Sequence, residues 1–511
     1  MTARRVSPRA RAARSLARGG AFALACAALS ACALSALDSA PQSPSTPWVP
    51  ATEAGGTAAA PGFRVPADRA VAVLIPTPGI VRDKAYSLPE LIDIAQTNNP
   101  LTRVAWQQAR QAALAAGMVE ATYLPFISAS VIGGHQKITN SLPLPIGTIN
   151  KVDSDLEGIS PQVALQWLVF DFGQRGALHA AAQHNATAAN ILFNAAHQKI
   201  IFDVTRTYAL HGAALSRERI AAQALANSRR IQDAAEERMR KGLGTTVELA
   251  QANQQVAQAR FALVQAQGAG HDAYQALLAA MGVSPVTTIK IREASGRPLP
   301  DTVAVPTEAL ITAALAQRPD VLASFSALKA SQAGIFAAQA EFLPKVFLSA
   351  VAVGGNTNFS AGGLPTIGQQ SSAAGVLVGA TVPLYDGGLR AARLRTAESL
   401  AAASEATLDK VRDTAAREIV VGANTLRSAL AAHTAATALV KAAAVTYDAA
   451  LDAYTSGVGT LTAATAADSA LLTARQAQAD AHAASLVAAA NLAFVLGDMT
   501  SREAPAPWMG R

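Results

Sequence analysis

Hydrophobic and polar residues alternate with a period of two in four stretches of this chain, which occur as two pairs. The first pair lies near residues 127–131 and 163–169, and the second near residues 346–353 and 376–384. This alternation predicts β-strands with one apolar and one polar face. We expect about ten residues in each strand, a length that crosses the hydrocarbon of a bilayer at a tilt. The polar, turn-rich residues between the strands of each pair are expected to form loops.

A helical pattern without proline follows each pair of strands, from Asp171 to Gly242 and from Asp386 to Gly457. As a single helix, each segment of about 70 residues would be about 100 Å long, well beyond an ordinary globular helix. Because such a helix is not stable alone, we expect it to lie against other helices. Two shorter helices, one before each pair of strands and one after each long helix, are expected to stack end to end beside it.

The junction between strand and long helix has the same features in both places. It reads Phe-Asp-Phe-Gly from Phe170 and Tyr-Asp-Gly-Gly from Tyr385. An aspartate at this point accepts hydrogen bonds from unpaired N–H groups at the helix start, and glycine permits the backbone angles of the bend. We predict these roles for Asp171, Gly173, Asp386 and Gly388.

Matching positions in the two halves of the chain keep a nearly constant separation. The junction aspartates are 215 positions apart, as are the Gly-x-Gly-Thr turns that end the long helices, whereas the Leu-Pro pairs before the strands are 219 apart. The length difference therefore lies between the strands, and the order of elements predicts one body with two repeats. The predicted helical-tip turns contain Gly242, Gly244, Gly457 and Gly459.

The beginning of the chain has the composition of an export signal, with six arginines and then an apolar, alanine-rich stretch. Leu29 to Cys32 has the form of a bacterial lipobox, which predicts acylation of Cys32 and a lipid anchor. An unmodified cysteine in a discarded leader is the alternative. The predicted organisation is a signal peptide at 1–31, a Pro/Ala-rich linker at 32–83, repeats at 84–300 and 301–498, and a tail at 499–511.

Charge and cysteine content exclude several function classes. The formal charge is +7, but the leader contributes six arginines, which leaves +1 and gives no support for nucleic-acid binding. No cysteine follows Cys32, so the body has no disulfide and no thiolate metal site. The sequence contains no recognisable catalytic motif, and its histidines are scattered. We therefore expect neither an enzyme nor a cofactor or metal.

The duplicated halves, the two junction motifs and the two Gly-x-Gly-Thr turns together resemble the TolC-like outer-membrane efflux family, in its lipid-anchored branch. The resemblance implies an α+β membrane protein that forms a homotrimer. Three chains would contribute four strands each to a twelve-stranded transmembrane β-barrel, continued by a long α-helical periplasmic barrel. It also implies an outer-membrane channel that conducts small molecules such as drugs, in a tripartite system with a periplasmic adaptor and an inner-membrane pump.

The resemblance further implies a gate near the helical tips. The matching positions are Glu248 just past the first turn, Asp468 past the second turn, and Tyr454 before it. Leu461 occupies the place of the family's arginine and Thr465 that of its other acidic residue, so the family's salt link is not expected here. From charge alone, Glu248 and Asp468 are equally consistent with solvated helix-face residues.

Three alternatives stay open at this stage. Four strands per chain are too few to close a barrel, so they form either a soluble sheet or a barrel shared by several chains. A trimeric coiled-coil surface fibre would also have long helices and a membrane end. A channel for protein secretion would share the architecture of a drug-efflux channel.

Overall fold

The computed structural model divides the chain into two units, residues 1–75 and 76–511, and all helices and strands named below belong to the second. The described residues are 40–41, 43–45, 63–64, 67, 69–74, 79–81, 83–146, 149–292, 299–300, 303–361 and 367–499. The predicted signal peptide, Cys32 and the predicted tail beyond Met499 lie outside them.

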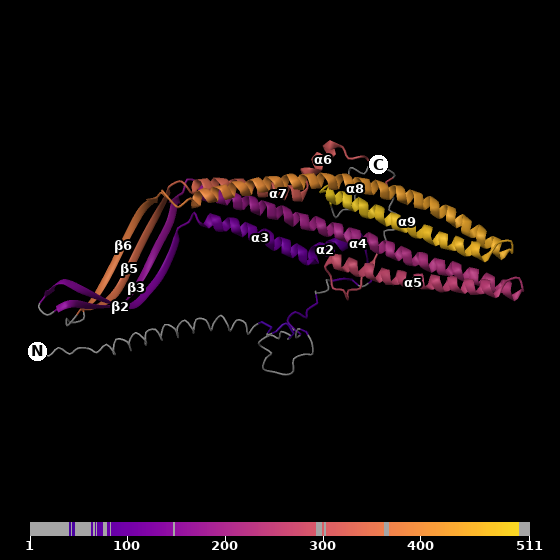
Figure 1. The fold of residues 1–511 in the computed structure, drawn as a ribbon, viewed down its shortest axis with the longest axis horizontal. Coiled ribbons are helices and arrows are strands. Elements are labelled where there is room, and N and C mark those ends of the chain that lie inside the picture. Colours follow the sequence, from indigo (N-terminus) through magenta and orange to yellow (C-terminus); the bar gives the residue numbers. More distant parts are fainter. Residues whose placement is uncertain are drawn as a thin grey trace, which may run out of the picture. The chain divides into compact units, whose positions relative to one another are not determined.

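Each repeat contains one very long helix and several shorter ones (Figure 1). The helices of the first repeat are α2 (Leu88–Asn98), α3 (Pro100–Ala121), α4 (Gln174–Arg240) and α5 (Thr246–Met281). Those of the second are α6 (Glu308–Leu315), α7 (Pro319–Ala340), α8 (Leu389–Thr455) and α9 (Leu461–Val495). The long helices α4 and α8 have 67 residues each, so the predicted continuous helices are present.

Shorter helices stack beside each long one, as the lengths predicted. Helices α3 and α5 both pack along α4, and α7 and α9 both pack along α8. The point at which two short helices meet end to end is held by the residue before the proline that begins α3 or α7. Asn99 donates a hydrogen bond from Nδ2 to the carbonyl of Ala280 at 3.0 Å, and Arg318 donates one from Nη1 to the carbonyl of Val495 at 3.0 Å. Each break between short helices is thereby attached to the end of the returning helix.

The two repeats join along α4, which packs against both α7 and α9 of the second repeat. A buried cluster near the helical tips unites all four long and returning helices. It includes Ile231, Ala252, Leu451, Tyr454 and Leu471. Small residues dominate these helices, which permits close approach of their axes. The joint between the repeats is therefore a packed seam and not a flexible linker.

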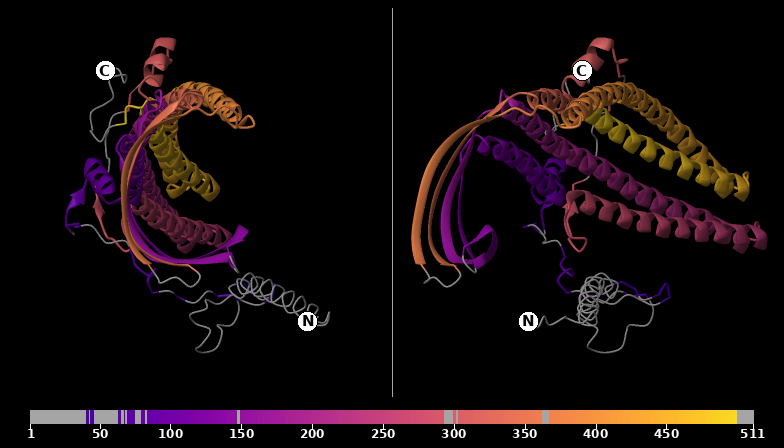
Figure 2. Two further views of the ribbon diagram at one scale, coloured as in Figure 1. Left: turned by 90° about the vertical axis from the view of Figure 1, so that its left-hand side faces the viewer. Right: turned by 60° about the vertical axis from the view of Figure 1, so that its left-hand side comes forward.

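The four long strands form one antiparallel sheet in the order β2-β3-β5-β6. They are β2 (Phe126–Ile146), β3 (Ile149–Phe170), β5 (Lys345–Ala361) and β6 (Ile367–Thr381). Figure 2 shows that the sheet is strongly curved. Two very short strands, β1 (Ala85–Tyr86) and β4 (Lys290–Ile291), pair in parallel elsewhere in the unit.

The strands contain 21, 22, 17 and 15 residues, so the predicted length of about ten was wrong. Much of the segments 133–160 and 354–374, predicted as loops, is strand. The backbone ladder continues in register from Phe126 opposite Gln166 to Ser141 opposite Lys151. Ladder hydrogen bonds join main-chain groups and do not need an apolar face, so the pairing extends past the alternating segment.

The strand register places the apolar residues of all four alternating segments on one face of the sheet. Ile127 lies opposite Leu165, Leu165 opposite Ala350, and Ala350 opposite Val376. The next row on this face is Ala129, Val163, Ala352 and Ala374. The other face is more polar, and there Gln162 donates a hydrogen bond from Nε2 to Ser130 Oγ at 2.9 Å. The sheet therefore has one continuous apolar face.

Among the described residues, helices α7 and α8 each contain an 18-residue stretch long and apolar enough to cross a membrane, with mean hydropathy of 1.2 and 1.3. Both helices are rich in alanine and pack against other helices. The apolar stretch of α7 is 44% buried and that of α8 only 11%, so packing within this chain covers α7 better than α8.

The contact between the end of α5 and the start of α3 can be tested with two glycines, one inside α5 and one at its C-terminal cap. Gly282 has φ +68°, and a Cβ there would lie 2.6 Å from the Cα of Asn99, whereas a Cβ at Gly268 would meet nothing within 4 Å. We expect Gly282→Ala to destabilise the protein by about 1–3 kcal/mol or more. Gly268→Ala should stabilise it by about 0.5–1 kcal/mol, because glycine is unfavourable inside a helix. Thermal unfolding of the two purified variants measures the sign, and equal shifts would contradict the stacking model.

Candidate functional site

The first strand–helix junction is held by a buried carboxylate. Asp171 Oδ2 accepts hydrogen bonds from the backbone N–H of Arg175 at 2.9 Å and from its Nε at 2.8 Å. Asp171 Oδ1 accepts a weaker one from the N–H of Gly173 at 3.3 Å, and Gly173 has φ +89°. The predicted roles of the aspartate and the glycine are both present.

Arg175 completes this junction and had no role in the sequence prediction. Its Nη1 donates to the carbonyl of Thr122 at 2.9 Å and its Nη2 to the carbonyl of Val169 at 3.3 Å. Its guanidinium also lies 4.7 Å from the ring centroid of Tyr123. One arginine thus ties the end of α3, the end of β3 and the start of α4 together.

The second junction repeats the arrangement. Asp386 accepts from the N–H of Arg390 at 3.0 Å, from its Nε at 2.7 Å and from the N–H of Gly388 at 3.0 Å, with Gly388 at φ +90°. Arg390 donates from Nη1 to the carbonyl of Pro383 at 2.8 Å and lies 5.2 Å from the ring centroid of Phe342. We call these two ion pairs, Asp171–Arg175 and Asp386–Arg390, the strand–helix clasps. An arginine four residues after each aspartate was the available sequence signal.

The helical-tip turns lie where they were predicted. Gly242 and Gly457 have φ of +73° and +86°, which favours glycine. A Cβ on Gly244 would lie 3.0 Å from the backbone nitrogen of Met239, and one on Gly459 would lie 2.9 Å from that of Tyr454. Each tip therefore needs its first glycine for backbone conformation and its second for space.

Glu248 forms a capping box at the start of α5. Its Oε2 accepts from the N–H of Thr245 at 3.1 Å, and its own N–H donates to Thr245 Oγ1 at 3.2 Å. Thr460 caps α9 in the same way through the N–H of Ala463 at 3.2 Å, without a carboxylate. The structure thus gives Glu248 a local structural role, and a role in a gate stays a prediction.

Asp468 lies in the seam between α9 and α4, not on an open surface. It is 2% exposed. Its Oδ1 accepts from Asn227 Nδ2 at 3.1 Å and its Oδ2 from Ser228 Oγ at 2.9 Å. Burial raises the pKa of Asp468, against the opposing effect of the two hydrogen bonds. The expectation of an open helix-face carboxylate is therefore wrong for Asp468, because packing of the repeats covers it.

Tyr454 is fully buried and connects to the other repeat through Arg238 of α4. The guanidinium lies 5.1 Å from the tyrosine ring centroid, and its Nη1 donates to the carbonyl of Tyr454 at 3.3 Å. Its Nη2 donates to the carbonyl of Leu243 at 3.3 Å. Burial raises the pKa of Tyr454, and the charge of Glu248 adds to this rise. Arg238 thus joins the tips of both repeats, a contact that the sequence did not reveal.

The two carboxylates among the three predicted gate residues have different partners within the chain. Glu248 caps its own helix, Asp468 bonds to α4, and Tyr454 contacts Arg238. Leu461, in place of the family's arginine, is buried in the apolar cluster. Within the described part of the chain, no group of three or more His, Cys, Asp or Glu side chains is arranged to hold a metal ion. What the tips provide is a set of polar links between packed helices.

The sequence matches a known family over both repeats. The model of the family described as "outer membrane efflux protein" matches residues 91–283 and 310–498. The chain belongs to the outer membrane efflux protein family. This confirms the resemblance to the outer-membrane efflux family and the prediction of an outer-membrane efflux component. The lipid-anchored branch stays a prediction.

Relatives of this outer membrane efflux protein include Protein CyaE of Bordetella pertussis. It is 29% identical over 451 residues, which cover 85% of this chain and 90% of the relative. The pyoverdine export outer membrane protein OpmQ of Pseudomonas aeruginosa is 28% identical over 274 residues, or 52% of this chain and 56% of the relative. A membrane protein from Pseudomonas aeruginosa has a similar fold, with a TM-score of 0.68 at 23% identity, over 81% of this chain and 91% of that structure.

Protonation of Asp468 gives a test of the seam. Because its pKa is raised above the ordinary value of 3.8, the folded protein holds this proton more tightly than the unfolded chain does. Its contribution to stability is therefore greatest at low pH and is lost as pH rises through the raised pKa. We expect the stability of Asp468→Asn relative to the wild type to increase over the same window.

Thermal unfolding between about pH 4 and 7 measures this difference. Asp93→Asn, at an exposed position of α2, serves as the matched control. A wild-type protein that gains stability relative to Asp468→Asn as pH rises would show that the seam stabilises the ionised form instead.

Proposed function

We propose that three copies of this efflux protein assemble into one continuous conduit across the outer membrane and into the periplasm. The proposal rests on the contact between the two repeats. This contact occurs once within the chain, and the same surfaces at the outer edges of the repeats have no partner in the described structure. Strand β3 pairs with β5 to connect the two hairpins, and α4 packs against α7 and α9 to connect the helices. By the equivalence of the repeats, β6 would pair with β2, and α8 with α3 and α5, of a neighbouring copy.

Exposed apolar side chains on the outer helices support this joint. Helices α3, α5 and α8 expose large apolar residues that a neighbouring copy would cover, including Leu114, Met118, Phe261, Val264, Leu439 and Val445. In the described sheet, β2 and β6 each pair on one side only. Head-to-tail contacts of this kind close into a ring when the rotation permits. Three copies, the number implied by the family resemblance, give twelve strands, which is enough to close a barrel.

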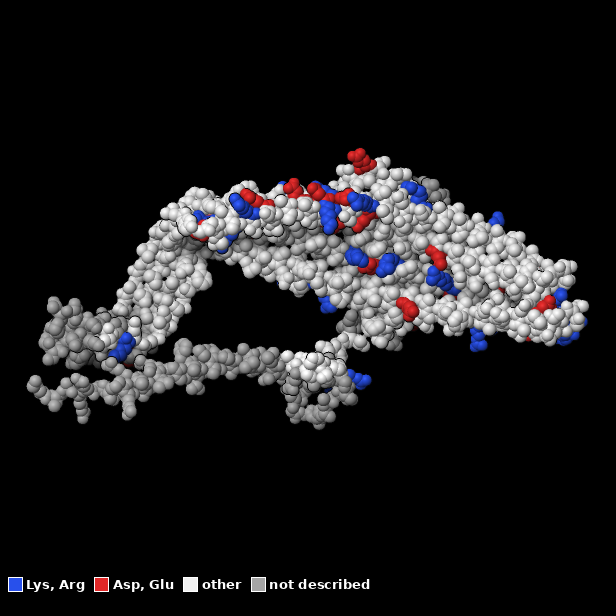
Figure 3. Space-filling view, in the orientation of Figure 1, with Lys and Arg blue, Asp and Glu red and all other residues white. Residues whose placement is uncertain are grey.

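The two faces of the sheet suit a membrane barrel. The apolar face that contains Ile127, Leu165 and Val376 would contact lipid, and the face that contains Gln162 and Ser130 would line the interior. On the face of the molecule seen in Figure 3, charged side chains gather over the helices, and the described sheet shows few of them. A cleaved signal and an acylated Cys32 would add a lipid anchor on the periplasmic side.

The conduit would serve as the outer-membrane part of a tripartite export system for small molecules. In this role it receives its cargo from an inner-membrane pump through a periplasmic adaptor, and it needs neither cofactor nor covalent chemistry. The small-molecule class is supported by the name of the relative OpmQ, which exports pyoverdine. A solid surface fibre is disfavoured because the chain enters the same sheet twice, through β2-β3 and β5-β6.

Imaging and conductance test the assembly together. Electron microscopy of the purified full-length protein should show a hollow trimeric tube, and the same material in planar bilayers should conduct ions. A monomer, or a solid stalk without conductance, would overturn the proposal. Export of a small molecule is then measured as its accumulation in cells that lack or contain this protein.

The two sheet faces yield a matched pair of substitutions. Val163 and Gln162 are neighbours in β3 on opposite faces, the apolar and the polar one. If the apolar face contacts the bilayer centre, Val163→Lys should lower the stability of the folded barrel by about 2–4 kcal/mol. Gln162→Lys should leave the stability nearly unchanged, because its face would line the interior. We expect the amount of trimer in outer-membrane fractions to fall for the first variant only. Equal behaviour of the two variants would argue for a sheet that is soluble on both faces.

The polar links at the helical tips would hold the periplasmic end narrow. In this role Arg238 bonds to Tyr454 across the two repeats, Asp468 secures the seam, and Glu248 keeps its tip folded. Arg238→Gln removes the guanidinium that joins the tips, so we expect a larger single-channel conductance in planar bilayers. Arg240→Gln is the control, since its side chain is 75% exposed. Conductance that is unchanged in Arg238→Gln would contradict a gating role for this link.

A further inference from the structure

An aromatic residue followed four positions later by a basic one occurs at the same place in both repeats. Trp106 and Arg110 of α3 form one pair, and Phe325 and Lys329 of α7 form the other. Corresponding members of the two pairs are 219 positions apart, the separation found for the Leu-Pro pairs. The Arg110 guanidinium lies 4.7 Å from the Trp106 ring centroid, and Lys329 Nζ lies 5.3 Å from that of Phe325. We call them the aromatic–cation pairs.

Both members of each pair are exposed. Trp106 is 46% exposed and Phe325 is 42% exposed, and Arg110 and Lys329 are exposed as well. Within the described part of the chain, neither cation forms an ion pair with a carboxylate. A cation–π contact between two residues of one exposed helix face is weak and leaves much of the ring uncovered. Each pair thus presents a flat ring and an uncompensated positive charge to its surroundings.

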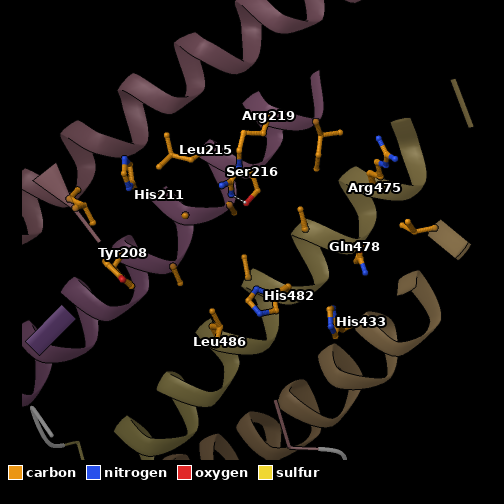
Figure 4. Close-up of a pocket in the computed structure, with 18 of the residues that line it drawn as sticks. Tyr208, His211, Leu215, Ser216, Arg219, His433, Arg475, Gln478, His482 and Leu486 are labelled. Carbon is orange, nitrogen blue, oxygen red and sulfur yellow. Dashed lines mark hydrogen bonds between the residues drawn. The ribbon is translucent and has the colours of Figure 1, made fainter. Parts of the chain in front are cut away.

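Packing in the seam between the repeats does not account for these pairs. Other aromatic and basic side chains, such as Tyr208, His433 and His482, line a cavity of about 560 Å³ in that seam, between α4, α8 and α9 (Figure 4). None of the described residues that line this cavity belongs to α3 or α7. The aromatic–cation pairs therefore lie outside the seam cavity, on the two short helices that flank α4.

A neighbouring copy is not the expected partner either. Helix α7 already packs against both α4 and α8 of its own chain, with Val321 buried in one cluster with Leu408 of α8. The pair on α7 stays exposed although both neighbours are present. In the proposed assembly α3 would likewise lie between α4 of its own chain and α8 of the next. By the equivalence of the repeats, the pair on α3 would then stay exposed as well.

The membrane is too far away to cover the pairs. Helices α3 and α7 both end close to the sheet, and Trp106 and Phe325 each lie 15 residues before the last residue of their helix, Ala121 or Ala340. Fifteen residues of helix are about 22 Å long, whereas the polar region on each side of the hydrocarbon is about 5–8 Å thick. With the sheet in the membrane, the pairs would lie in the periplasm, both at the same distance from the bilayer.

We propose that the aromatic–cation pairs bind an anionic glycan outside the tube, namely peptidoglycan, a polymer of sugar rings that carries carboxylates. A sugar ring would lie flat on Trp106 or Phe325, and a carboxylate would accept a hydrogen bond from Arg110 or Lys329. The polymer repeats both groups along its length, as the pairs repeat around the tube. The inference rests on the proposed function, because three copies would place six pairs at one level, where weak contacts reinforce one another.

Cosedimentation with purified peptidoglycan sacculi tests the proposal on the full-length trimer in detergent. Sacculi whose carboxylates have been converted to amides are the ligand control. We expect native sacculi to retain at least about tenfold more trimer than amidated sacculi, since a hydrogen bond to a charged group contributes about that factor. Retention should also fall as salt rises from about 0.05 to 0.5 M, because salt screens exposed charges. Equal retention on the two kinds of sacculi, or none on either, would overturn the proposal.

Double variants locate the contact. Arg110→Gln with Lys329→Gln, and separately Trp106→Ala with Phe325→Ala, should each lower retention on native sacculi at least about tenfold, because the loss at each of the six pairs is multiplied. The exchange Trp106→Phe with Phe325→Trp keeps an aromatic ring at both positions and should preserve retention. Loss of retention in this exchange, or full retention in both of the other variants, would place the glycan elsewhere on the protein.

The matched control removes two charges from a helical tip. Arg240→Gln with Lys241→Gln changes side chains that are 75% and 63% exposed, and retention should be unchanged. Size-exclusion chromatography and conductance check the assembly of each variant. A trimer that conducts but is not retained would disprove the glycan contact and leave the proposed function standing. Binding of soluble muropeptides without retention on sacculi would show that the pairs face the lumen, which overturns the proposal because an insoluble sacculus cannot enter the tube.

Discussion

Backbone hydrogen bonding at the edges of the sheet is the constraint on which the rest of this protein depends. Inside a bilayer, every N–H and C=O group must find a partner within protein. Strands β3 and β5 satisfy each other in the middle of the sheet, and β2 and β6 remain as edges of the described chain. Four strands are too few to close a barrel, even in a strongly curved sheet. In the proposed assembly, further copies of the same chain would supply the additional strands that a closed barrel needs.

The strand–helix clasps attach the helices to the sheet, so the positions of the long helices depend on the positions of the strands. Each clasp attaches a strand and a short helix to the start of a long helix, through one aspartate and one arginine. The order of strands in the sheet therefore fixes the order of helices beyond it. A long helix gains little stability from its own sequence and much from packing along its length. This explains why α4 and α8 are each lined by two shorter helices over most of their extent.

Polar contacts from α4 to the second repeat, first to α9 and then to α8, occur at nearly regular steps. On α4 they involve Arg217, then Asn227 and Ser228, then Arg238. Steps of 10 or 11 residues are about three helical turns, so these side chains lie on one face of the helix. Between them α4 buries three alanines together with Leu225 and Ile231, and these apolar contacts have no directional hydrogen bonds. The polar contacts thus set the register of the seam.

The sequence alone determined the features that depend on neighbours in the chain. Proline-free stretches defined α4 and α8, alternation located the strands, and local motifs placed Asp171 and Asp386 at the helix starts and the glycines at the tips. These features follow from spacings of two to four residues, which backbone geometry converts directly into structure. Glu248 was singled out by the family resemblance as a gate carboxylate, and the structure shows that it caps its own helix.

Tertiary structure decided which faces of the helices meet. Alanine fits on every face, so an alanine-rich helix gives little indication of its rotation, and the contacts of Asp468 with Asn227 and of Arg238 with Tyr454 were not predictable. The strands run past their alternating segments because main-chain pairing, not side-chain pattern, ends a ladder. His211, His433 and His482 appear scattered along the chain and yet line one cavity, since only the packing of three helices brings them together.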